Sequence, residues 1–214
     1  TSSLTFAQTS YQFQEPTEGE INEAIQKIVP VRFLINNPLY YLITFKETVN
    51  RFFQPSAAKK TEFDMVLSGK KVKEAYMPWQ KGDVKNSRKT LKIYSDRVNN
   101  MVKQLEKARS QNQDVAGLVD VMAENLRLHE TLFSALNEMR DLNNDSYSFN
   151  TNFELAVKSH SNAALALDKI RPGLKDRFRT VPKEATEAAQ PSPSPVLGDL
   201  FEASPSFRPR RIIY

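Results

Sequence analysis

The chain of 214 residues contains no cysteine, and this absence excludes three kinds of chemistry at once. A protein without cysteine forms no structural disulfide, uses no thiolate nucleophile and holds no zinc through sulfur ligands. Glycine is also scarce, with six residues scattered along the sequence. No glycine-rich phosphate-binding loop and no Gly-x-Ser-x-Gly motif occurs, so the sequence is predicted not to be an enzyme.

Histidine is nearly absent, since only His129 and His160 occur. Both fall on apolar stripes of expected helices, and neither has a glutamate three residues before it, as carboxylate-bridged metal bundles require. No His-Glu-x-x-His motif is present either. The sequence therefore favours structural histidines and predicts no cofactor. The alternative is a ligand- or metal-binding helical protein that uses His129 and His160 between helices, with a carboxylate such as Glu130.

Long hydrophobic runs are missing as well. The most apolar window, residues 28–45, is interrupted by two prolines, two asparagines and an arginine. A transmembrane helix needs about 20 apolar residues with few polar interruptions, so this window does not span a bilayer. Asn37-Pro38 instead predicts a helix start, because asparagine caps exposed N–H groups and proline suits the first helical turn.

The residues after Asn37-Pro38 predict an amphipathic helix whose apolar face lies in the core of a domain. Polar residues gather on its other side, where Glu47 and Arg51 are spaced for an ion pair within the helix. The apolar residues recur at helical spacing: Leu39, Leu42, Ile43, Val49, Phe52 and Phe53.

Further helices are expected at about 20–28, 56–77, 84–108, 115–142 and 149–170. The clearest has the 3-4 apolar spacing of a bundle seam or a short coiled coil: Leu91, Tyr94, Val98, Met101, Leu105 and Ala108. A second stripe comprises Val119, Met122, Leu126, His129, Phe133 and Leu136. No run of strict alternation indicates a strand. The predicted fold is all-α, an antiparallel helical bundle or extended helical hairpins of about five to six helices.

Charge and proline divide the chain into a body and a tail. From Arg171 to Tyr214 there are eight basic and five acidic residues, which leaves the body nearly balanced within a net charge of +5. A nucleic-acid-binding protein usually carries a basic stripe on its folded part, so no nucleic-acid partner is expected. Seven of the twelve prolines lie between Pro172 and Pro209, and residues 172–214 are predicted to be a disordered tail.

Two segments of this tail are candidate partner-binding sites. The apolar residues of the first would share one face if the segment became helical on a partner: Val196, Leu197, Leu200 and Phe201. The second carries Arg208, Arg210 and Arg211, which are suited to phosphates or acidic surface polymers. The remaining boundaries are a flexible N-terminus at residues 1–19 and a helical domain at 20–171.

The N-terminal segment has small residues where a signal peptidase reads a sequence. Thr5-Phe6-Ala7 followed by Gln8 predicts the end of a secretory signal peptide, and hence a secreted or cell-envelope location. An ordinary flexible N-terminus is the alternative.

Several short motifs between residues 28 and 110 resemble one bacterial family. They comprise Pro30, Asn37-Pro38-Leu39-Tyr40, Lys46-Glu47, Pro55, Lys59-Lys60, Lys70-Lys71 with Glu74, and Lys81-Gly82-Asp83. The pattern is similar to the family catalogued as domain of unknown function 5667. This sequence departs from it at Ile43-Thr44, where a basic residue is usual, and at Lys71, where arginine is usual. The resemblance implies an exported or membrane-attached bacterial protein with no established activity.

These observations predict a non-catalytic, exported or envelope-associated helical interaction module. Its partner is expected to be another protein or an anionic envelope polymer. The alternatives are the histidine-based ligand or metal site and a polyanion binder that acts through the basic end of the tail. The apolar seam of the helix expected at 84–108 permits a dimer and equally serves an internal bundle. The sequence therefore leaves the oligomeric state open.

Overall fold

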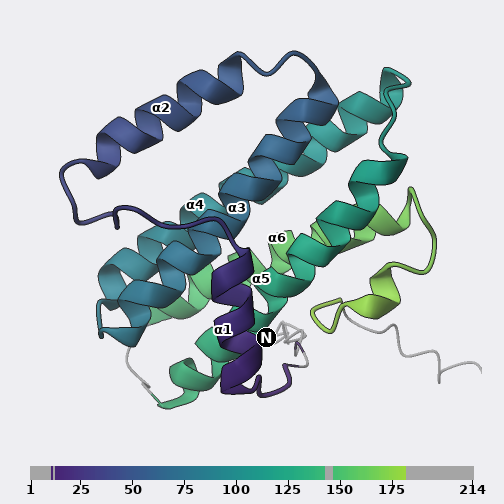
Figure 1. Cartoon of the computed structure of the whole chain (residues 1–214). Coiled ribbons are helices and arrows are strands. Elements are labelled where there is room, and N and C mark those ends of the chain that lie inside the picture. The colour runs from purple at the N-terminus through teal and green to yellow at the C-terminus, as the bar shows by residue number, and fades with distance from the viewer. Residues whose placement is uncertain (1–10, 12, 143–146, 182–214) are drawn as a thin grey trace, which may run out of the picture. The chain divides into compact units, whose positions relative to one another are not determined.

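The computed structural model describes residues 11, 13–142 and 147–181 (Figure 1). Within these residues the chain forms six α-helices and one 3-10 turn, without a strand, which confirms the all-α prediction. The elements are α1 (Glu18–Lys27), α2 (Tyr40–Phe52), α3 (Ala57–Gln80), α4 (Val84–Ser110), α5 (Ala116–Leu142), α6 (Tyr147–Asp168) and η1 (Lys175–Arg177). No helix in this part of the chain is both long and apolar enough to span a bilayer.

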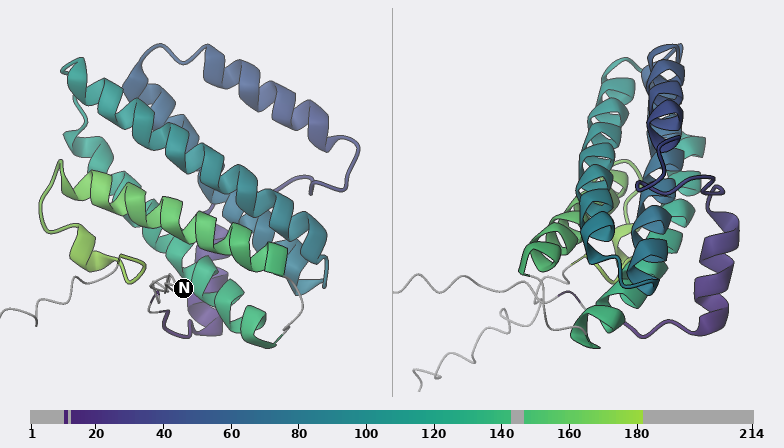
Figure 2. Two further views of the ribbon diagram at one scale, coloured as in Figure 1. Left: turned by 180° about the vertical axis from the view of Figure 1, so that it is seen from behind. Right: turned by 90° about the vertical axis from the view of Figure 1, so that its left-hand side faces the viewer.

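The four long helices form the bundle. Helix α4 packs against α3 and α6, and α5 packs against α3 and α6 as well. Figure 2 shows α1 and α6 on opposite faces of this bundle. The predicted seams are confirmed, because every residue of the α4 seam and of the α5 stripe is buried in one continuous core.

Local sequence signals explain where these helices begin and end. The Thr17 hydroxyl and the Glu20 carboxylate form a capping box at the start of α1, and Ser56 caps α3. Helix α3 ends in a Schellman motif, in which Gly82 has a φ of 75° and its N–H bonds the Trp79 carbonyl at 2.9 Å. Asp83 then caps α4, so two helices meet in a three-residue turn.

Two predicted helix boundaries move. Helix α2 starts at Tyr40, and the Asn37 side chain accepts a hydrogen bond from the Leu39 N–H at 2.9 Å in the turn before it. Helix α3 continues beyond the predicted end at residue 77 to Gln80, with Pro78 inside its last turn.

The body extends beyond both predicted domain boundaries. Leu174, Phe178 and Val181 are buried, so the predicted disordered tail does not begin at residue 172. The proline content of residues 172–214 led to the prediction of disorder, although these three apolar residues pack against the core after the turn at Gly173. At the other end Phe13 packs on Phe153, with ring centroids 5.8 Å apart, so part of the predicted flexible N-terminus belongs to the core. The tail prediction for residues 182–214 lies outside the described residues.

Gly69 lies where α3 approaches α5 too closely for any side chain. A Cβ at this position would stand 2.8 Å from Nε2 of His129, a buried ring that cannot swing away. Helix propensity favours alanine by about 1 kcal/mol, whereas overpacking a filled core costs about 1–3 kcal/mol.

We therefore expect Gly69→Ala to lower the free energy of unfolding, although alanine has the higher helix propensity. Urea denaturation measures this change. Gly117→Ala is the matched control, since no atom lies within 4 Å of its added Cβ, and it should be neutral or stabilising. Equal effects of the two substitutions would contradict the close packing of Gly69 on His129.

Candidate functional site

Helix α2 is turned opposite to the sequence-based prediction. Its polar face lies against the bundle, where Tyr40 and Glu47 are buried. Its apolar face points to solvent, with exposed fractions of 46% to 76%: Leu39, Tyr41, Leu42, Phe45, Phe52 and Phe53. Figure 1 shows α2 at the edge of the molecule, beside α3. The prediction that Leu39, Leu42, Phe52 and Phe53 lie in the core is therefore wrong.

The reason is a set of charges that α3 carries on its buried surface. Lys70, Lys71 and Glu74 are each less than 7% exposed. Lys70 forms an ion pair with Glu47 of α2 and lies 3.5 Å from Glu74, and Lys71 binds Glu74 at 2.7 Å. Two lysines and two glutamates thus neutralise one another between the helices.

Tyr40 joins this network at the start of α2. Its hydroxyl accepts a hydrogen bond from Nζ of Lys71 at 2.8 Å and donates one to Glu74 at 3.2 Å. Burial raises the pKa of Tyr40 well above 10, and the charge of Glu74 raises it further. The phenol therefore stays protonated and acts as a fixed donor to the carboxylate at neutral pH.

A second ion cluster fixes the other end of α2. Arg51 binds Asp64 of α3 in a bidentate pair, with distances of 2.6 Å and 2.7 Å. Arg97 of α4 approaches the same carboxylate at 3.5 Å. Glu47 and Arg51 each pair with α3, so the ion pair predicted within α2 does not form. The hydrogen bond to Asp64 raises the pKa of Arg51.

The electrostatic cost explains why α2 does not bury its apolar face here. A half-turn rotation of α2 would set phenylalanine and leucine against Lys70 and remove Glu47 from it. Leaving a buried charge without its partner costs about 3–5 kcal/mol, and this surface holds several charges. Burial of a large apolar side chain contributes about 1.5–3 kcal/mol. A partner that covers the outer face of α2 would gain this free energy on binding.

The two histidines lie elsewhere, inside the core. The rings of His129 on α5 and His160 on α6 are fully buried, with centroids 6.5 Å apart. Both ring nitrogens of His160 have protein partners at 2.9 Å, the Thr180 hydroxyl and the Leu126 carbonyl. Tyr94 lies 3.3 Å from Nδ1 of His129. Within the described residues no group of three or more side chains could hold a metal ion.

The pattern of partners also gives His160 its tautomer. A carbonyl only accepts, so Nε2 of His160 carries the proton, and Nδ1 accepts from the Thr180 hydroxyl. His160 thereby attaches the segment after α6 to α5. The geometry supports the structural interpretation of the histidines over the metal-binding alternative, because neither nitrogen of His160 is left to bind a ligand.

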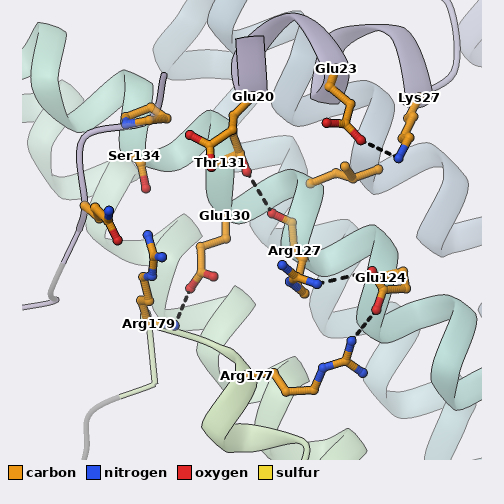
Figure 3. Close-up of a pocket in the computed structure, with 13 residues that line it drawn as sticks. Glu20, Glu23, Lys27, Glu124, Arg127, Glu130, Thr131, Ser134, Arg177 and Arg179 are labelled. Carbon is orange, nitrogen blue, oxygen red and sulfur yellow. Dashed lines mark hydrogen bonds and ion pairs between the residues drawn. The ribbon is translucent and has the colours of Figure 1, made fainter. Parts of the chain in front are cut away.

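A polar pocket of about 340 Å³ lies between α1, α5 and the segment after η1 (Figure 3). Its charged side chains already contact protein atoms. Glu124 pairs with Arg127 and Arg177, and Glu130 accepts the backbone N–H groups of Arg179 and Thr180 at 2.7 Å each. Four acidic and four basic residues line the pocket, so its charge is balanced. These contacts hold the 175–181 segment on α5 and make the pocket a structural joint.

The partner-binding residues predicted from the sequence all lie outside the described residues: Val196, Leu197, Leu200, Phe201, Arg208, Arg210 and Arg211. The same holds for the cleavage site predicted at Ala7-Gln8.

The sequence analysis did not predict the exposed apolar surface of α2, although one signal was available. Lys70, Lys71 and Lys73, together with Glu74, place four charges within five residues of a helix that must be buried, and such charges need counter-ions from a neighbour.

No family model, curated protein or solved structure matches this chain. The resemblance of residues 28–110 to a bacterial family of unknown function remains a prediction. Of its motifs, Tyr40, Glu47, Lys70, Lys71 and Glu74 meet in the charge network between α2 and α3.

We expect Glu47→Gln to loosen α2 without unfolding the bundle. Lys70 loses its shortest ion pair, and α2 has its main packing contacts with α3 alone, so the helix opens locally. Amide hydrogen exchange across residues 40–53 should accelerate by about tenfold or more, while the buried seam of α4 is unchanged.

The control for this experiment is Glu62→Gln, which removes an exposed pair with Lys59. Exposed pairs contribute about 0–1 kcal/mol, so exchange in α2 should not change. Unaltered exchange in Glu47→Gln would show that the network does not hold α2.

The buried histidines predict a loss of stability in mild acid. Burial lowers the pKa of His129 well below 6.5, and the neighbouring His160 lowers it further. Burial also lowers the pKa of His160, against opposing effects of Glu130 and the Leu126 carbonyl. Below pH about 6.5 the unfolded chain therefore binds more protons than the folded chain. The free energy of unfolding decreases there as the pH is lowered.

The free energy of unfolding should be constant above pH about 7.5 and decrease towards pH 5 by up to ~1.4 kcal/mol per pH unit for each histidine. Urea denaturation at several pH values measures this slope. His160→Gln should reduce the slope, because one of the two titrating groups is gone. A wild-type urea midpoint that is equal at pH about 7.5 and 5.5 would contradict neutral, buried histidines.

Proposed function

We propose that this chain is a non-catalytic helical binding module whose docking element is the outer face of α2. The supporting observation is that α2 directs Tyr41, Phe45 and Phe52 outward, each at least 70% exposed, while Glu47 and Arg51 bind α3. A contiguous exposed apolar surface marks an interaction site in soluble proteins.

The arrangement separates support from binding. Helices α3 to α6 form a core that closes without α2, and α2 is attached to that core through α3. Its ion pairs fix which face is presented, so the binding surface exists before the partner arrives. A preformed surface loses less conformational freedom on association than a segment that must first fold.

An extracytoplasmic location is also part of this proposal. It rests on the predicted signal-peptidase site and on the resemblance of residues 28–110, and the binding surface of α2 does not depend on it. A ligand site between the histidines has less support, because protein atoms engage both ring nitrogens of His160.

Photo-crosslinking tests the docking role directly. A benzophenone amino acid at position 45, expressed in the native host, should give adducts of defined size on irradiation. The matched control places it at Tyr147, an aromatic residue that is 89% exposed on α6. Adducts at position 45 and not at position 147 are expected, and absence of adducts at position 45 would refute α2 as the docking element.

A further inference from the structure

The outer face of α2 has an unusual composition for a free protein surface. Three of its exposed large residues are phenylalanine, one is tyrosine and two are leucine. They recur at helical spacing, Tyr41, Phe45 and Phe52 on one flank and Leu42 and Phe53 on the other. Aromatic and leucine side chains on one face are typical of helices that lie in a membrane interface.

The charges around this face have one sign. From Val29 to Ala58 the chain has three basic residues, Arg32, Lys46 and Arg51, and a single acidic residue, Glu47. Arg51 is bound to Asp64, and Glu47 is buried against Lys70. Arg32 and Lys46 are exposed and have no ion-pair partner among the described residues. The outward surface of α2 is thus apolar and cationic, without an accessible carboxylate.

The charge network produces this surface. By holding Glu47 inward, Lys70 removes the only negative charge that α2 could offer to solvent. Anionic headgroups attract basic residues close to the membrane, at about 1 kcal/mol for each lysine or arginine. A carboxylate among the exposed aromatics would oppose that attraction, and the structure keeps it away from them.

Position in the fold also suits a flat partner. Helix α2 lies along one edge of the molecule, next to α3, and its outer side faces away from the bundle (Figures 1 and 2). Its 13 residues are too few to span a bilayer, which needs about 20. A helix of this length can lie in the plane of the interface, with its apolar side chains among the acyl chains and Lys46 at the headgroups.

A second copy of the chain fits the same face less well. A two-fold interface uses one patch on both subunits, so the patch must complement itself. Two such faces would bring Lys46 of both copies to one interface with no exposed acid from either α2 helix. Like charges brought together in this way oppose association.

We propose that the outer face of α2 binds the surface of an anionic phospholipid membrane, with the helix lying parallel to the bilayer. This inference rests on the proposed function and names the partner of the same surface. The side chains of Phe45, Phe52 and Phe53 enter the interface, and Lys46 contacts the headgroups. The four long helices remain outside the membrane.

Vesicle sedimentation tests the proposal with the full chain. Wild-type protein should sediment with vesicles in which about a third of the lipid is phosphatidylglycerol, and more weakly with phosphatidylcholine alone. Phe45→Ser should lower the partition coefficient about tenfold or more, because a large apolar side chain no longer enters the interface. Lys46→Gln should lower it about fivefold, and binding of the wild type should weaken as salt is raised.

Tyr147→Ser is the matched control, because it removes an exposed aromatic side chain from α6 and should leave vesicle binding unchanged. Phe45 is 70% exposed, so its replacement should also leave the helical circular-dichroism signal and the urea midpoint unchanged. A loss of vesicle binding is then a property of the surface and not of the fold.

Other outcomes separate this inference from the proposed function. If no vesicle binds and position 45 crosslinks to a protein, the membrane proposal is overturned and the docking role of α2 stands. If no vesicle binds and the chain forms a dimer that depends on Phe45, the partner is a second copy, which also overturns it. Absence of both vesicle binding and crosslinks would remove the proposed function as well.

Discussion

The ion pair between Lys70 and Glu47 determines which face of α2 is exposed to solvent. Helix α3 carries two lysines and a glutamate on a surface that its neighbours bury, and Glu47 and Tyr40 of α2 complete their partners. With Glu47 and Tyr40 bound to α3, the side chains of Tyr41, Phe45 and Phe52 on the opposite side of α2 face solvent. Leaving a buried charge without its partner costs about 3–5 kcal/mol, and the observed orientation of α2 keeps Glu47 and Arg51 with their partners on α3.

The core obeys a different constraint, which is close packing around two neutral histidines. His129 fills the space left by Gly69 on α3, and His160 joins the Leu126 carbonyl on α5 to Thr180 beyond η1. Phe178 then covers the His160 ring, with centroids 5.8 Å apart. The segment after α6 is therefore part of the body through polar and apolar contacts together. The polar pocket between α1 and α5 reinforces the same attachment.

Stability and binding thus reside in separate parts of the fold. The seams of α4 and α5 bury their apolar residues against neighbouring helices, and no charged network interrupts them. Helix α2 contributes few apolar contacts to that core and is fixed by ions at both ends. Such an element can keep an exposed apolar face because its position does not depend on burying it. A preformed, cationic and aromatic face is the feature of this protein that its surroundings can recognise.

The sequence by itself determined the helices and the core. Apolar spacing located α4 and α5 and their buried stripes, because those helices meet the bundle through their apolar sides. Spacing also located α2 but assigned Phe52 and Phe53 to the core, since hydrophobic periodicity identifies an apolar face and says nothing about what it meets. Only the tertiary structure brought Glu47 to Lys70 across 23 residues, and only it buried Phe178 after the turn at Gly173. Periodicity is local, whereas the partners of buried charges are set by packing between distant segments.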